Sequence, residues 1–222
     1  MQLIKKYNYA DLKREDGDVR LYLTPDGESL PSVTSVLNKT KDKSFLKKWR
    51  EKVGEKKAEQ IIRDSSRIGT ALHLYIEHIA NGKKYKDLTK IGVQAEKMAK
   101  KIIKESFKDI TDVWGSEVHL YYPKKYAGTT DMVCIYKGKP AIIDFKQTNK
   151  PKKREWVQDY LMQLAAYAQA HNELFGTNIE HGVILMCSRG LTFQRFELEG
   201  ANFHRAGDAF MKKLDLYNKS II

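Results

Sequence analysis

Cysteine is scarce in this sequence of 222 residues: only Cys134 and Cys187 occur, and both lie in short apolar stretches. Their surroundings predict two reduced thiols in a core rather than a disulfide or a cysteine-rich metal cluster.

Long apolar runs are also missing, because no window approaches the 18 apolar residues that a membrane-spanning helix needs. The N-terminus carries neither the apolar segment of a secretory signal nor the acid-free, Arg- and Ser-rich composition of an organelle leader. We therefore predict a cytoplasmic protein that does not contact a membrane.

Repeats, low-complexity tracts and Pro/Gly-rich linkers are absent as well. We predict a single domain over residues 1–222, with a mainly helical part over 30–110 and a sheet core over 111–200. The sequence G-x-x-x-x-G-K-[ST] does not occur, so we expect no ATP-binding loop and no ATP-driven motor.

What the chain has in excess is positive charge. It contains 40 Lys and Arg residues against 28 Asp and Glu, a formal net charge of +12. Such a balance favours a polyanionic partner, most often nucleic acid. Many small basic proteins are merely soluble, so the charge does not name the partner by itself.

The order of apolar patterns predicts an α/β (α+β) fold in which helices flank a central mixed sheet. A basic helical stretch covers 43–66, and Ser65 or Ser66 can cap the next helix. The inner face of that helix is formed by Ile68, Leu72, Ile76 and Ile79. The other predicted elements are strands at 18–24, 116–122, 130–136, 141–147, 181–188 and 191–198 and helices at 92–107, 155–175 and 203–217.

One strand carries an acid and a base on the same face, because Asp144 and Lys146 are two residues apart. If Lys137 and Gly138 form a two-residue turn to the preceding strand, Asp131 lies directly opposite Asp144. A four-residue loop would instead place Asp131 opposite Lys146. Either register collects the three charged side chains on one face of the sheet.

Two carboxylates so close repel each other unless a cation lies between them. A hard divalent cation, Mg²⁺ or Mn²⁺, is the natural resolution, and Lys146 could then orient a nucleophile or offset charge on a phosphate. The alternative is an ordinary surface ion pair between Asp144 and Lys146 on an edge strand, with Asp131 nearby by chance.

Four motifs strengthen the metal interpretation. They are GTALH at 69–73, GTTD at 128–131, DFK at 144–146 and QLAAY at 163–167. In this order they resemble the PD-(D/E)XK nuclease superfamily of the RecB exonuclease type. The similarity to the mitochondrial genome maintenance exonuclease branch is closer still and covers most of residues 30–190.

The resemblance implies a metal-dependent DNA exonuclease that prefers single-stranded ends, uses one or two Mg²⁺ or Mn²⁺ ions, and acts in DNA replication, repair or recombination. It implies that His73, Asp131 and Asp144 ligate metal, that the Phe145 carbonyl is a further ligand, and that Lys146 is the catalytic lysine. Without an organelle leader, we expect a bacterial or viral member acting in the cytoplasm.

The same resemblance gives Gln163 and Tyr167 a role in positioning the DNA backbone or the lysine, since both lie on one helix face. Taken without it, Tyr167 would be a core residue and His73 a structural histidine. Glu77 could hydrogen-bond the imidazole of His73 or simply face solvent. Glu117 either adds an acidic group around the site or is merely exposed.

Two departures from the family pattern stand out. Gln147 follows the lysine where the family often has Thr or Ser, which affects fine positioning rather than the metal site. Some RecB-type nucleases hold an iron–sulfur cluster on four cysteines, and two cysteines exclude that arrangement.

Two basic segments, at 47–57 and 149–156, each include a tryptophan. We interpret them as phosphate contacts with a stacking face for unpaired bases, although solvated basic helices with core tryptophans would give the same sequence. Two other functions remain open. One is a structure-specific endonuclease on the same fold, and the other is a catalytically silent DNA-binding module.

Overall fold

The computed structural model describes residues 2–220. Its centre is a six-stranded sheet in the order β1-β5-β6-β7-β8-β9. Pairing is parallel between β1 and β5 and between β7 and β8, and antiparallel elsewhere, so the sheet is mixed as predicted. The strands are β1 (Gln2–Leu3), β5 (Ile110–Tyr122), β6 (Tyr126–Tyr136), β7 (Lys139–Thr148), β8 (Gly182–Ser188) and β9 (Phe193–Leu198).

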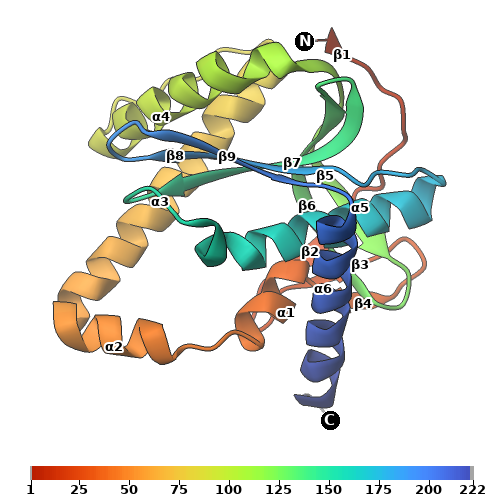
Figure 1. Cartoon of the computed structure of the whole chain (residues 1–222), viewed down its shortest axis with the longest axis horizontal. Coiled ribbons are helices and arrows are strands. Elements are labelled where there is room, and N and C mark those ends of the chain that lie inside the picture. Colours follow the sequence, from red (N-terminus) through yellow and green to blue (C-terminus); the bar gives the residue numbers. More distant parts are fainter. Residues whose placement is uncertain (1, 221–222) are drawn as a thin grey trace.

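Helices cover both faces of this sheet (Figure 1). On one face, α3 (Glu55–Ala80) and α4 (Lys90–Ser106) bury a core that includes Leu72, Met98 and Phe145. On the other, α1 (Val33–Lys39), α5 (Gln158–Phe175) and α6 (Ala201–Ser220) pack around Ile142 and Phe210. The chain crosses from β7 to parallel β8 through α5, the usual connection between parallel strands.

The N-terminal part of the chain contributes a small second sheet. It is formed by β2 (Lys13–Glu15), β3 (Leu21–Leu23) and β4 (Ser29–Pro31) in antiparallel order. The hydroxyl groups of Tyr22 in β3 and Thr129 in β6 share a hydrogen bond of 3.0 Å. This contact links the small sheet to the strand that carries Asp131.

The basic segment 47–57 forms an elbow that projects from the body (Figure 1). Its first arm is α2 (Ser44–Val53), none of whose residues is buried, and its second arm is the start of α3. The two helices meet at Gly54, whose φ of 88° favours glycine. The elbow therefore presents its lysines, and Phe45 with 79% of its surface exposed, to solvent.

The predicted boundary at Ser65 or Ser66 is wrong. Both serines lie inside α3, which begins at Glu55. Serine caps helices well, but it is tolerated within one when the residues before it continue the helical pattern. Ile79 is also misplaced, because it is 38% exposed at the end of the helix.

Most other expectations about the fold are confirmed. The closing helix buries Phe203, Phe210, Leu214 and Tyr217. The helix expected from residue 155 begins at Gln158, after a short 3₁₀ turn η2 (Arg154–Val157); a second such turn, η1 (Phe107–Asp109), precedes β5. Both cysteines are buried free thiols. None of the helices within residues 2–220 is long and apolar enough to cross a membrane.

Candidate active site

The candidate site lies where two neighbouring strands separate. The turn between β6 and β7 consists of Lys137 and Gly138, with φ of 48° and 79°, so Tyr136 pairs with Lys139. Pairing of β6 with β7 extends from that turn to Met132 and Ile143 and then ends. Beyond this point β6 pairs only with β5, and β7 only with β8. Asp131 and Asp144 are the next residues on the two strands, so they face each other across the fork.

The carboxylate of Asp131 lies between β6 and β7 where their pairing ends. Its Oδ2 accepts a hydrogen bond of 2.6 Å from the backbone N–H of Phe145. The Asp131 carboxylate thus replaces a backbone carbonyl of the neighbouring strand as acceptor. The Phe145 N–H therefore has a hydrogen-bond partner although β6 and β7 have separated. The other carboxylate oxygen, Oδ1, lies 3.4 Å from Nδ1 of His73.

His73 reaches the fork from α3. Its Nε2 lies 2.9 Å from the Phe145 carbonyl oxygen, which can only accept, so this ring nitrogen donates. Burial lowers the pKa of His73, but the carboxylates of Asp131 and Glu117 outweigh burial and raise that pKa to about 9. Without a bound cation, the two anions facing Nδ1 hold the ring protonated at neutral pH; a cation bound at Nδ1 would take the place of that proton.

Glu117 completes an acidic group with His73 and Asp131. Their ligand atoms all lie within 4.8 Å of one another. Glu117 is 3.5 Å from Nδ1 of His73, and its φ of 52° is in the left-handed region, which is costly for a residue with a side chain. The strain is local to the site. Beside Asp131, the carboxylate facing the imidazole is thus Glu117, whereas the sequence analysis offered Glu77 for that contact.

Asp144 is the most buried carboxylate of the site, with 1% of its surface exposed. Its Oδ1 accepts a 2.5 Å bond from the ammonium of Lys146 and a 3.3 Å bond from the amide of Gln163. Burial raises the pKa of Asp144, Lys146 lowers it and the charge of Asp131 raises it, and the net result is a pKa of about 6. Its Oδ2 is buried and has no hydrogen-bond partner within residues 2–220.

Lys146 is held as a cation. Burial lowers its pKa, but the carboxylates of Asp144 and Asp131 outweigh burial, so the net shift raises the pKa. Its Nζ also lies 5.2 Å from the ring centre of Tyr160. A lysine in this setting supplies positive charge and a hydrogen-bond donor and is a poor base.

Gln163 and Tyr167 lie behind Asp144 on α5. Gln163 Nε2 donates to the Tyr167 hydroxyl at 3.4 Å as well as to Asp144. The Tyr167 ring packs directly on β6 at Gly128, where an added Cβ would lie 2.8 Å from a ring carbon. Gly128 is thus required for this contact. Tyr167 is buried, and its hydroxyl contacts Gln163.

Next to the acidic group lies an open pocket of about 520 Å³, whose lining includes His73, Glu77 and Glu117 as well as Arg14 and Arg20. Both arginines come from the small sheet and its turn, and no sequence motif marks them. The carboxylate of Asp16 forms ion pairs with both guanidinium groups, at 2.7 Å to Arg14 and 2.8 Å to Arg20. Because these residues are far from the motifs along the chain, only the fold reveals them.

The residues present fit a divalent cation. An imidazole and two carboxylates with converging oxygen and nitrogen atoms form a suitable donor set. The partnerless Oδ2 of Asp144 is a further buried acceptor at the same fork. The Phe145 carbonyl, predicted as a ligand, accepts a hydrogen bond from His73, so it lies at the same place.

The remaining predicted residues are positioned as follows. Trp156 in η2 is 58% exposed, whereas Trp49 in α2 is half-buried. Gln147 donates from its amide to the Ser65 carbonyl of α3 at 3.0 Å, so it ties β7 to α3. Exposed Phe45 was not singled out by the sequence, because an apolar residue in an amphipathic helix predicts burial.

Comparisons with known proteins are informative at the level of fold. No protein-family model and no curated protein matches the sequence. A crystal structure of a protein from Eubacterium rectale, described provisionally as an exonuclease, superposes with a TM-score of 0.52 at 15% identity over 72% of this chain and 69% of that one. An alkaline exonuclease from Laribacter hongkongensis gives a TM-score of 0.31 at 13% identity over 68% and 81% of the two chains. The mixed sheet flanked by helices is thus a fold that this chain shares with the Eubacterium rectale protein.

Proposed function

We propose that the protein is a deoxyribonuclease that hydrolyses phosphodiester bonds with the help of Mg²⁺ or Mn²⁺, and that it removes nucleotides from single-stranded ends. One observation carries the proposal. The acids Asp131 and Asp144 meet at a strand fork, with Lys146 bonded to one of them and His73 beside the other.

A divalent cation bound among His73, Asp131, Asp144 and the Phe145 carbonyl supplies Lewis acidity and positive charge beside a phosphate. The chain's own groups do the rest. Lys146, kept protonated by its neighbours, stabilises the negative charge that grows on the phosphate as a water oxygen bonds to phosphorus and the bond to the leaving oxygen breaks. The attacking water gives up a proton to solvent, and the leaving oxygen takes up a proton from solvent.

Gln163 is a positioning residue in this proposal. Its amide donates to the carboxylate oxygen that also binds Lys146, so it fixes the orientation of Asp144. Tyr167 in turn fixes Gln163, and the close approach at Gly128 fixes Tyr167.

Substrate binding is supported by positive charge and by exposed aromatic rings. The net charge of +12 favours a polyanion. Arg14 and Arg20 line the pocket beside the acids, where they suit a phosphate next to the one that is cleaved. Phe45 and Trp156 expose rings on which unpaired bases can stack.

The motif order and the shared fold support placing the chain in the PD-(D/E)XK superfamily, among RecB-type exonucleases related to the mitochondrial genome maintenance branch. With that placement we propose a cytoplasmic role, in a bacterium or virus, in DNA replication, repair or recombination.

The test is nucleotide release from 5′- and 3′-labelled single strands and duplexes in Mg²⁺, Mn²⁺ and EDTA. Asp131→Ala and Asp144→Asn should abolish release while binding to DNA ends in EDTA persists. Asp215→Asn, which removes an exposed acid of α6, is the matched control. Unchanged release in both site variants would refute the assignment of the site.

Two rival functions give different results in the same assay. A structure-specific endonuclease would cut a circular single strand, because that substrate has no end, whereas an exonuclease leaves it intact. A silent DNA-binding module would bind DNA ends without releasing nucleotides in either metal.

A further inference from the structure

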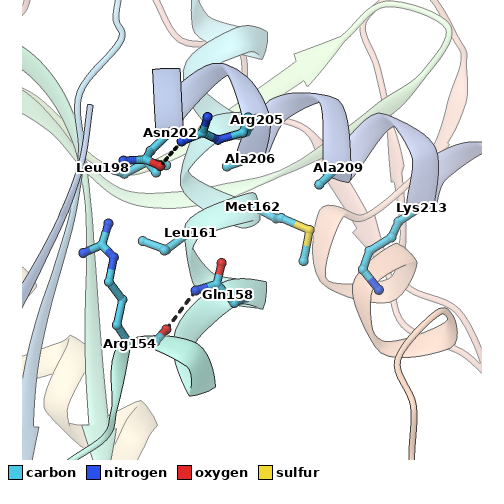
Figure 2. A pocket seen from close by; sticks show the side chains of 10 residues that line it. All are labelled: Arg154, Gln158, Leu161, Met162, Leu198, Asn202, Arg205, Ala206, Ala209 and Lys213. Carbon is cyan, nitrogen blue, oxygen red and sulfur yellow. Dashed lines mark hydrogen bonds between the residues drawn. The ribbon is translucent and has the colours of Figure 1, made fainter. Parts of the chain in front are cut away.

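A second concave site lies between α5 and α6, with a volume of about 500 Å³. Figure 2 shows its apolar floor, formed by Leu161 and Met162 of α5, and Ala206 and Ala209 on the α6 side. Leu161 and Met162 are buried, so this floor is part of the packed core rather than a loose surface. Its volume is within the usual range for small binding sites.

Three cationic side chains surround the floor: Arg154, Arg205 and Lys213 (Figure 2). Arg154 donates to the Glu197 backbone carbonyl at 2.9 Å, and Lys213 donates to the Thr40 backbone carbonyl at 3.2 Å. These acceptors are neutral, so they orient the side chains without cancelling their charges.

Arg205 is held in the same way. It donates to the side-chain oxygen of Asn202 at 2.6 Å (Figure 2). Within the described part of the chain, no carboxylate lines the pocket. The pocket therefore combines an apolar floor with an uncompensated positive rim, which suits a ligand that carries apolar groups between negative charges.

We propose that this pocket binds a short acidic peptide of a partner protein, with an apolar side chain on the floor and carboxylates at the rim. A nucleotide is a poorer match, because none of the residues 2–220 that line the pocket is aromatic, and bases bind chiefly by stacking. The site is also separate from the acids. Residues 161 and 163 are two positions apart on α5 and so point in opposite directions, with Gln163 facing Asp144.

The probe is a fluorescein-labelled peptide, Asp-Asp-Leu-Phe-Asp-Asp, titrated with the full chain in EDTA and followed by fluorescence anisotropy. We expect saturable binding that weakens at least tenfold when the Asp residues are replaced by Asn or when Leu and Phe are replaced by Ser. Binding in EDTA does not depend on nuclease activity, so the proposed function and this site can fail separately.

Three protein variants locate the site. Arg205→Glu, at an exposed rim position, should weaken binding at least tenfold, and Ala209→Trp should do the same by filling the pocket. Lys212→Glu is the matched control, since Lys212 is exposed on α6 and does not line the pocket, and should change affinity less than twofold. The methyl signal of Met162 should shift on peptide addition in the wild-type chain.

Three outcomes would overturn the proposal. The first is no saturable binding below about 1 mM, with no shift of the Met162 methyl signal. The second is an equal loss in Lys212→Glu and Arg205→Glu, which would show attraction to the overall charge alone. The third is displacement of the peptide by a ten-nucleotide single strand of thymidylate, which would assign the pocket to nucleic acid.

Discussion

Lys146→Met should destabilise the folded protein strongly at pH 8 in the absence of divalent cations. The substitution keeps an unbranched side chain that is one atom shorter and uncharged, and it leaves Asp144 without its charged partner. Removing one partner of a buried ion pair costs about 3–5 kcal/mol. The Lys146 side chain is 19% exposed and that of Asp144 is 2% exposed, so we place the loss near the lower end, at about 3 kcal/mol.

The loss should depend on pH in a definite direction. The folded-state pKa of Asp144 is raised to about 6 with Lys146 present, and it rises further in the variant because Lys146 lowers it. A group whose pKa is raised on folding contributes stability at low pH and loses it as pH rises through the folded-state value. The deficit of Lys146→Met should therefore shrink between pH 8 and pH 5, where Asp144 becomes neutral.

Urea unfolding followed by circular dichroism, in EDTA at both pH values, measures the deficit. Lys139→Met is the matched control on the same strand, because its ion pair with Glu199 is exposed and should cost no more than about 1 kcal/mol. The double variant Lys146→Met/Asp144→Asn should regain part of the loss, since no charge is left unpaired. A deficit under about 1 kcal/mol at pH 8, or one equal at both pH values, would refute the reasoning.

Three further predictions concern packing and DNA. Gly128→Ala should lower the free energy of unfolding by about 1–3 kcal/mol, because its Cβ would overlap the Tyr167 ring. Gly69→Ala in α3, where the nearest atom is 3.8 Å away, should leave stability unchanged or raise it by up to about 1 kcal/mol; equal urea midpoints for the two would contradict both. Trp156→Ala should weaken binding of a single strand in EDTA by about 1–3 kcal/mol, whereas Trp156→Phe should retain most of it; equal losses would exclude stacking. If six phosphates are contacted, the logarithm of the binding constant should fall with the logarithm of salt at a slope of about −4, and a flat response would argue against a DNA partner.

The shared face of Asp131, Asp144 and Lys146 could be predicted, because both turn lengths that the sequence left open place them on one side of the sheet; the structure has the shorter turn. The two-residue turn has positive φ at both positions, which suits Gly138 and is unusual for Lys137, and strand alternation then sets which side chains face each other. Strand alternation predicts that Asp131, Asp144 and Lys146 are neighbours. The expectation of helices on both sides of the sheet followed from the order of apolar patterns.

Other features could not be read from local patterns. Glu117 reaches His73 because its backbone is left-handed inside a strand, and no residue type announces that conformation. Arg14 and Arg20 come to the site through a small sheet whose docking depends on tertiary contacts. The start of α3 was misjudged because Ser65 and Ser66 have good capping chemistry, while the residues before them continue the helix.

The Phe145 amide N–H donates a hydrogen bond to the Asp131 carboxylate, so its NMR signal reports on the state of that carboxylate. An amide proton bonded to a carboxylate responds in its chemical shift when that carboxylate gains a proton or a cation. In a ¹⁵N-labelled sample, a single resonance could therefore follow ion occupancy during a titration, with every side chain of the site left intact.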